Sequence, residues 1–182
     1  MVSPGDIQPD LSRENLFAAN DVLAILHERR WLAAEPSPEQ IAWCEHAAAL
    51  LGHFVQDSAG LVALLQLVFE YDASQILNQV DAHAILARHS ARDVVRHLAL
   101  LLLEGPPLDS DRFKQIVASL KDALQFRSRD LFHPIRLALT GRVGEGELDR
   151  VILLLDEAAA LPFAVPVKSA RTRILEFCAA LD

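Results

Sequence analysis

The sequence predicts an all-α protein made of two packed helical subdomains. Apolar side chains recur at three- and four-residue steps through most of the chain, which is the spacing of one helix face. Residues that cap or end helices separate these stretches, and no stretch shows the alternation of a half-buried strand. The 182 residues, 52% hydrophobic and 23% charged, suffice for one large or two small globular domains.

Five helical stretches are expected before residue 105. Their apolar faces comprise Leu16, Ala19, Leu23 and Leu26; Ile41, Cys44, Ala48 and Leu51; Leu61, Leu64, Leu65 and Val68; Ile76, Leu77, Val80 and Ala84; and Val94, Val95, Leu98, Leu101 and Leu102. Side chains suited to capping precede four of them, namely Ser12, Ser37, Ser58 and Ser90. Two of these form capping boxes, with Gln40 three residues after Ser37 and Asp93 three residues after Ser90.

The segment Gly105-Pro106-Pro107 ends the fifth helix and is the predicted domain boundary. After it, Asp109 or Ser110 is expected to cap a helix, and Pro134 to start a short one that Gly141 ends. Two further helices are expected. Their apolar faces comprise Leu148, Val151, Ile152 and Leu155, and Ile174, Leu175, Cys178 and Leu181.

The charge is divided unevenly at this boundary. Residues 1–107 hold 6 Lys/Arg and 14 Asp/Glu, whereas residues 108–182 hold 11 of each, so the first part carries the whole net charge of −8. This balance argues against broad, sequence-independent binding of nucleic acid, which requires a basic face. An anionic partner is expected to prefer residues 108–182.

Composition also indicates where the protein works. Two cysteines, Cys44 and Cys178, are too few for a disulfide framework and fit a reducing, cytoplasmic location. The longest strongly apolar run, Leu98–Leu103, is too short to span a membrane, and the N-terminus has no signal-peptide pattern.

Catalytic and metal-binding patterns are weak. Cys44-x-His46 with His53, and Asp81-x-His83 with His89, are the arrangements that suggest a metal site, but the chain has no HExxH and no CxxC. The serines are accounted for as helix caps, and Cys44 lies on an apolar helix stripe. We therefore expect no catalytic residue, metal or cofactor, with a metal-dependent helical bundle as the weakest alternative.

Basic residues gather in one stretch of the second part. Four arginines are the predicted RNA-binding residues: Arg127, Arg129, Arg136 and Arg142. Guanidinium groups match phosphates and base edges, and Phe126 and Phe132 between them are candidates for stacking on unpaired bases. The alternative is that the phenylalanines are core residues and the arginines pair with neighbouring acids.

The segment Leu131–Arg142, LFHPIRLALTGR, resembles the Leu-Phe-x-Pro-Leu-Arg-x-Ala-Leu-Thr-Gly-x motif of bacterial glutamyl-tRNA synthetases. That motif belongs to their all-helical, C-terminal anticodon-binding region. The resemblance extends over roughly residues 55–158, and residues 1–50 have no counterpart. The family's catalytic motifs, His-Ile-Gly-His and Lys-Met-Ser-Lys-Ser, do not occur in this chain.

The resemblance implies a stand-alone, non-catalytic relative that binds tRNA or acts beside a synthetase, with no membrane association. The alternative is a protein-interaction module that kept the fold and lost RNA binding, since the acidic residues 1–107 would repel a phosphate backbone. A continuous positive strip of the four arginines would favour RNA, whereas scattered arginines paired with acids would favour the interaction module.

Overall fold

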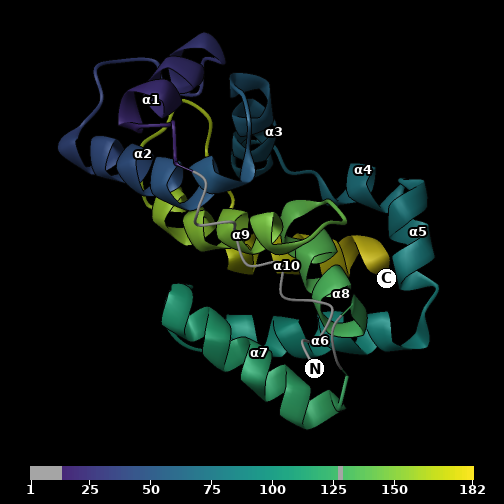
Figure 1. Ribbon diagram of the computed structural model, residues 1–182. Helices are drawn as coiled ribbons and strands as arrows, with labels where there is room; N and C mark the ends of the chain where they lie inside the picture. The colour runs from purple at the N-terminus through teal and green to yellow at the C-terminus, as the bar shows by residue number, and fades with distance from the viewer. Residues whose placement is uncertain (1–13, 127–128) are drawn as a thin grey trace.

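The computed structural model describes residues 14–126 and 129–182, and these residues form helices and loops without strands (Figure 1). The all-α prediction is confirmed. The elements are α1 (Ala19–Glu28), α2 (Pro38–Leu51), a 3₁₀ turn η1 (Gly52–Phe54), α3 (Ser58–Phe69), α4 (Ala73–Leu77), α5 (Val80–Leu86), α6 (His89–Leu103), α7 (Ser110–Leu124), α8 (Arg129–Thr140), α9 (Gly146–Ala159) and α10 (Ala170–Leu181).

Two hydrophobic clusters hold the helices together. One joins α1, α2 and α3 to α9, and the other joins α4 to α8 with α10. Helix α9 lies between them: Val151, Leu154 and Leu155 belong to the first cluster, whereas Ile152 belongs to the second. Figure 1 shows α9 and α10 in the middle of the molecule, between α1–α3 and the α6–α7 pair. Each helix other than α9 thus turns its apolar face toward one of the two cores.

The clusters cross the position of the predicted domain boundary. Helices α4–α6 precede Gly105 but share a cluster with α7 and α8, and α9 contributes to both clusters. The division at residue 107 stays a prediction about domains. The two hydrophobic cores instead separate α1–α3 from α4–α8 and α10, and α9 contributes to both.

An aromatic group fills the centre of the first cluster. The rings of Trp31 and Phe69 stack 4.7 Å apart, and Trp43 and Phe69 meet edge to face at 5.8 Å. Phe163, from the loop after α9, packs edge to face on both Trp43 and Phe69. Residues far apart in the sequence therefore fix α2, α3 and α9 in one arrangement, because such ring pairs add to their buried area.

Local signals placed several helix starts correctly. Ser37 Oγ accepts from the Gln40 N–H, and the Gln40 side chain accepts from the Ser37 N–H at 2.9 Å, as the capping box predicts. Asp109 caps α7 by accepting from the Arg112 N–H at 2.7 Å. Gly141 ends α8 with φ +79°, a conformation that favours glycine.

Two other expected caps were wrong. Helix α3 begins at Ser58, as expected, but its cap is Asp57, which accepts from the Gly60 N–H. Helix α6 begins at His89, so Ser90 lies inside the first turn and the expected capping box does not form. Only Ala87 and Arg88 separate α6 from α5.

The first and the eighth helix also begin elsewhere than expected. Helix α1 begins at Ala19, where Asp21 accepts from the Ala18 N–H, and the expected cap Ser12 lies outside the described residues. Helix α8 begins at Arg129, five residues before Pro134. Pro134 therefore lies inside α8, where it removes the N–H that would have bonded the Asp130 carbonyl, and the early start of the helix buries Leu131.

Five positions assigned to apolar faces are exposed instead: Leu16, Ile41, Val80, Ala84 and Leu175. Leu16 is 76% exposed and Val80 is 82% exposed, because Leu16 precedes α1 and Val80 opens α5. Ile41 is 36% exposed, and Trp43 takes the buried place on α2.

Candidate RNA interface

Arg136, in the middle of α8, is a buried structural anchor. Its Nε and Nη2 donate to the two carboxylate oxygens of Asp149, each at 2.9 Å, and its Nη1 donates to the Gly144 carbonyl at 3.0 Å. The carboxylate of Glu145 lies 3.7 Å from the same Nη1. Arg136 is only 6% exposed. Its bidentate ion pair with Asp149 therefore fixes the α8–α9 loop against both helices.

The end of α8 sets the direction of this loop. Thr140 Oγ1 donates to the Arg136 carbonyl at 2.7 Å and accepts from the Arg142 N–H at 3.3 Å. The Gly141 N–H donates to the Leu137 carbonyl, which closes the last turn. Thr140 thus bonds back to its own helix, and the predicted helix end at Gly141 is confirmed. Together they hold Arg142 at the start of an ordered loop.

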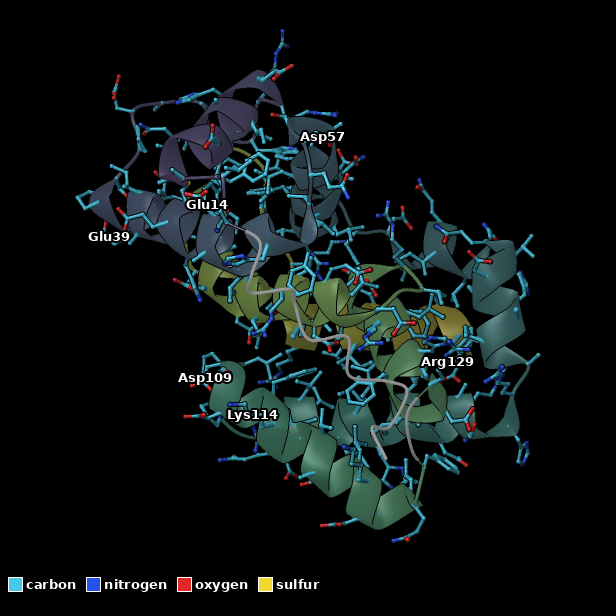
Figure 2. The ribbon with its side chains drawn as sticks, in the orientation of Figure 1. Glu14, Glu39, Asp57, Asp109, Lys114 and Arg129 are labelled. Carbon is cyan, nitrogen blue, oxygen red and sulfur yellow. The ribbon has the colours of Figure 1, made fainter. Side chains whose placement is uncertain are left out.

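The remaining predicted arginines lie at opposite ends of α8. Arg142 and Arg129 are exposed, and neither guanidinium has a hydrogen-bond or ion-pair partner among the described residues. Figure 2 labels Arg129 at the start of the helix. A helix rises about 1.5 Å per residue, so the two ends of α8 are about 16 Å apart. Arg127 lies outside the described residues.

Phe132 is half-buried, and two cationic side chains lie over its ring. Its ring packs on the second hydrophobic cluster, with the Arg136 guanidinium 4.9 Å and the Lys121 ammonium 5.7 Å from its centroid. Phe126 is likewise half-buried against that cluster. Both rings are therefore part of the packing, and Lys121 on α7 joins the basic surface beside α8.

Two functional candidates were missed in the sequence. Arg88, between α5 and α6, reaches Asp130 at the start of α8 with Nη1–Oδ1 at 2.9 Å. His133 on α8 has a buried Nδ1 atom that makes no hydrogen bond to any of the described residues. Arg88 lies in the acidic part of the chain, so counting charge by halves concealed it, and only the contact between α6 and α8 brings it to Arg129.

The cysteine and histidine candidates are engaged in packing and pairing. Cys44 is fully buried, and burial, together with nearby Glu45, raises the pKa of its thiol to about 12. His46 Nδ1 lies 2.8 Å from the Glu157 carboxylate on α9. Within residues 14–126 and 129–182, no three His, Cys, Asp or Glu side chains are grouped as metal ligands.

None of the described helices is both long and apolar enough to cross a lipid bilayer.

The geometry defines a class of protein: an all-helical unit with a helix–loop–helix segment that a buried arginine locks in place. The motif that carried the family resemblance, Leu131–Arg142, makes up most of α8 and begins this locked loop. Arg136, Thr140 and Gly141 of the motif each have an architectural role in it.

Comparisons with known proteins identify the relatives. The chain is 25% identical over 157 residues to the glutamate–tRNA ligase of Exiguobacterium sibiricum, covering 86% of this chain and 32% of that protein. It is 28% identical over 124 residues to the ligase of Geobacillus thermodenitrificans, covering 68% of this chain and 25% of that protein. A shorter stretch of 77 residues is 36% identical to glutamate–tRNA ligase 2 of Syntrophus aciditrophicus. No protein-family model matches the chain.

The predicted resemblance is confirmed: the chain is similar to a part of glutamate–tRNA ligases, consistent with their C-terminal anticodon-binding region. The chain spans about a third or less of the length of these relatives. The similarity reaches farther than the expected residues 55–158, since the 157 residues matched exceed that range.

Proposed function

We propose that this chain binds tRNA without catalysing aminoacylation itself, as a relative or accessory of glutamyl-tRNA synthetases. The observation that carries the proposal is the similarity to glutamate–tRNA ligases over 86% of the chain. Those proteins, by their name, join glutamate to tRNA. Binding of tRNA is one part of that activity, and an all-helical segment of this size provides a surface for it.

The proposed contact is local and centred on the α8–α9 loop. Arg142 is exposed there and free of acidic partners among the described residues, and Arg129 extends the surface to the other end of α8. Arg136 supports the contact from inside, because its pairing with Asp149 and Gly144 holds the loop in position. Arg127 is kept in the proposal as a neighbour of Arg129 in the sequence.

The test is a titration of the purified chain with a labelled glutamate tRNA at several salt concentrations. Binding through a few phosphates should weaken as salt rises, with a slope of about one per contact. Arg142→Glu should lower the affinity about tenfold or more and reduce the slope. Arg29→Glu is the matched control, because Arg29 is exposed on the far side of the first cluster and undergoes the same change of charge.

The absence of salt-sensitive binding at low ionic strength would overturn the proposal. Equal losses in Arg142→Glu and Arg29→Glu would instead show that net charge alone matters, and would remove Arg142 from the role.

A second function, a protein-interaction module, is favoured by the pairing of arginines with acids. Arg136 is neutralised by Asp149, and Arg88 contacts Asp130. The net charge of −8 adds to this. Affinity capture from a cell extract separates the two, because recovery of tRNA favours the first proposal and recovery of a protein partner without RNA favours the second.

A further inference from the structure

An apolar groove of about 350 Å³, the α6–α10 groove, lies where α4, α5 and the start of α6 meet the end of α10. Its walls include Leu77, His83, Leu86, Arg92, Ala180 and Leu181. The three leucines are half-buried against the second hydrophobic cluster, so part of each side chain remains outside that core. Figure 1 shows the end of α10 beside α5, where these walls come together.

Helices α6 and α10 run antiparallel along this groove. Arg92 and Leu181 both line it. About one turn farther along each helix, Arg96 lies near Cys178: burial and Asp182 raise the pKa of the Cys178 thiol, and Arg96 lowers it. Two basic side chains of α6 thus lie along the apolar wall that α10 provides.

Exposed leucines continue this surface beyond the groove. Arg92, Arg96 and Leu100 follow at four-residue steps and share one face of α6, and Leu175 and Cys178 share one face of α10. Leu100 is 63% exposed and Leu175 is 45% exposed. Apolar and basic side chains are therefore mixed along both helices.

The two arginines beside the groove lack partners within the described part of the chain. The guanidinium groups of Arg92 and Arg96 make no hydrogen bond or ion pair with residues 14–126 and 129–182, and both residues are exposed. Arg88 and Arg136, in contrast, pair with neighbouring carboxylates. Unpaired cations at the edge of an apolar groove match an occupant that supplies carboxylates of its own.

The chemistry of the groove distinguishes among classes of occupant. No aromatic ring of the described residues lines it, so RNA bases have nothing to stack on, and leucine side chains do not bind phosphates. A second copy in a two-fold contact would place the same arginines against each other or against leucines. An extended peptide would need an unpaired strand edge, and the described residues form no strand.

An amphipathic helix matches the remaining requirements. Its apolar stripe can fill a groove between two helices, and acidic residues beside that stripe can reach the basic edge. We propose that the α6–α10 groove binds an amphipathic, acidic helix of a partner protein, with apolar side chains against Leu86 and Leu181 and carboxylates at Arg92 and Arg96. The proposal goes beyond tRNA binding and does not depend on it.

Designed peptides are the probe. The first has about 18 residues, with leucines at three- and four-residue steps on an alanine-rich helix and glutamates beside the leucines. A second peptide has lysines in place of the glutamates, and a third has the glutamates and a central proline, which breaks the helix. Each carries a fluorescent label, and its anisotropy is followed as the full chain is added.

We expect the glutamate peptide to bind about tenfold or more tightly than the lysine peptide or the proline peptide. The net charge of the chain, −8, favours the lysine peptide. A preference for glutamate therefore reports local charge at the binding surface and not overall attraction.

Ala180→Gln tests the location of binding. Ala180 is exposed and lines the groove, so glutamine obstructs the groove without removing a core residue or changing the charge. The glutamate peptide should bind about tenfold more weakly to this variant. Ala118→Gln, the same change on the exposed face of α7, is the matched control and should stay within about twofold of the original chain. Thermal unfolding of each variant checks that the fold is retained.

Arg92→Glu tests the charge at the edge of the groove. It should weaken binding of the glutamate peptide about fivefold and strengthen binding of the lysine peptide by a similar factor. Arg29→Glu changes the net charge equally, far from the groove in the first cluster, and should affect both peptides much less.

The possible outcomes separate this proposal from the others. No binding of the glutamate peptide up to about 1 mM, or equal binding by Ala180→Gln and Ala118→Gln, overturns it. A loss of tRNA affinity in Ala180→Gln without a loss of peptide affinity assigns the groove to RNA instead. Self-association of the chain in sedimentation, abolished by Ala180→Gln, assigns it to a second copy. Peptide binding by a chain that binds no tRNA supports the groove while the proposed function fails.

Discussion

Replacing Arg173 with methionine should destabilise the whole fold. This arginine on α10 is fully buried and donates four hydrogen bonds to backbone carbonyls, at 2.6–2.9 Å. The acceptors lie in the last turns of α3 and α8 and in the loop before α10: Leu67, Val68, Leu139 and Lys168. A cation there satisfies carbonyls that a helix end leaves free and faces the negative end of two helix dipoles. Because α3 and α8 belong to different clusters, Arg173 joins the two halves of the core.

The magnitude follows from opposing contributions. A hydrogen bond from a charged donor contributes about 1.5–3 kcal/mol, so four contribute at least about 6 kcal/mol. Burial opposes the charge and lowers the pKa of Arg173 from 12.5 to about 10, which corresponds to a cost of about 3 kcal/mol. The guanidinium, with its centre 4.7 Å from the ring centroid of Tyr71, remains charged at neutral pH. The net loss in Arg173→Met is therefore at least about 3 kcal/mol.

Chemical denaturation followed by circular dichroism measures this loss as a change in the free energy of unfolding. In thermal unfolding, for a chain of this length, about 3 kcal/mol corresponds to a fall in Tm of roughly 6–12 °C. Arg171→Met is the matched control, because Arg171 is exposed on the same helix and its replacement should change stability by less than about 0.5 kcal/mol. A loss below about 1 kcal/mol in Arg173→Met, or equal losses in the two variants, would refute the view that this side chain joins the clusters.

Three further predictions concern local features of the structure. Gly141→Ala should cost about 1–2 kcal/mol in urea unfolding, because φ is +79° and the new Cβ would lie 2.7 Å from the Ile76 side chain; an unchanged midpoint would contradict this. Cys44, with its pKa raised to about 12, should resist alkylation at pH 8 in the folded protein and react on unfolding. Since its folded pKa exceeds the unfolded value of 9.0, the stability that this thiol contributes is fully present below pH 9 and declines as the pH rises toward 12. Asp156→Asn should lower the Tm by a few degrees, because its carboxylate accepts from two backbone N–H groups, including that of Ala170 at 2.8 Å; an equal Tm would show that the amide oxygen suffices.

The sequence predicted local structure best where that structure depends on residues close together in the chain. The box of Ser37 and Gln40 and the helix end at Gly141 are local, and both formed as predicted. The start of α8 was not predictable from Pro134, because the burial of Leu131 in a distant cluster outweighs the preference of proline for a first turn. Arg173 received no role at all, since two of its acceptors lie more than 100 residues away in the chain.

The candidate site shows the same limit in terms of charge. In the sequence, Arg129, Arg136 and Arg142 belong to one basic stretch. In the structure, Arg136 is buried and paired with Asp149, and the other two arginines lie at opposite ends of α8. Residue counts also assigned Arg88 to an acidic domain, whereas packing places it beside Arg129. The net charge of −8 is thus a poor guide to the charge of this surface, because a charge acts over only about 8 Å at physiological salt. Within that distance, the pairing and exposure of individual side chains determine how positive each end of α8 is.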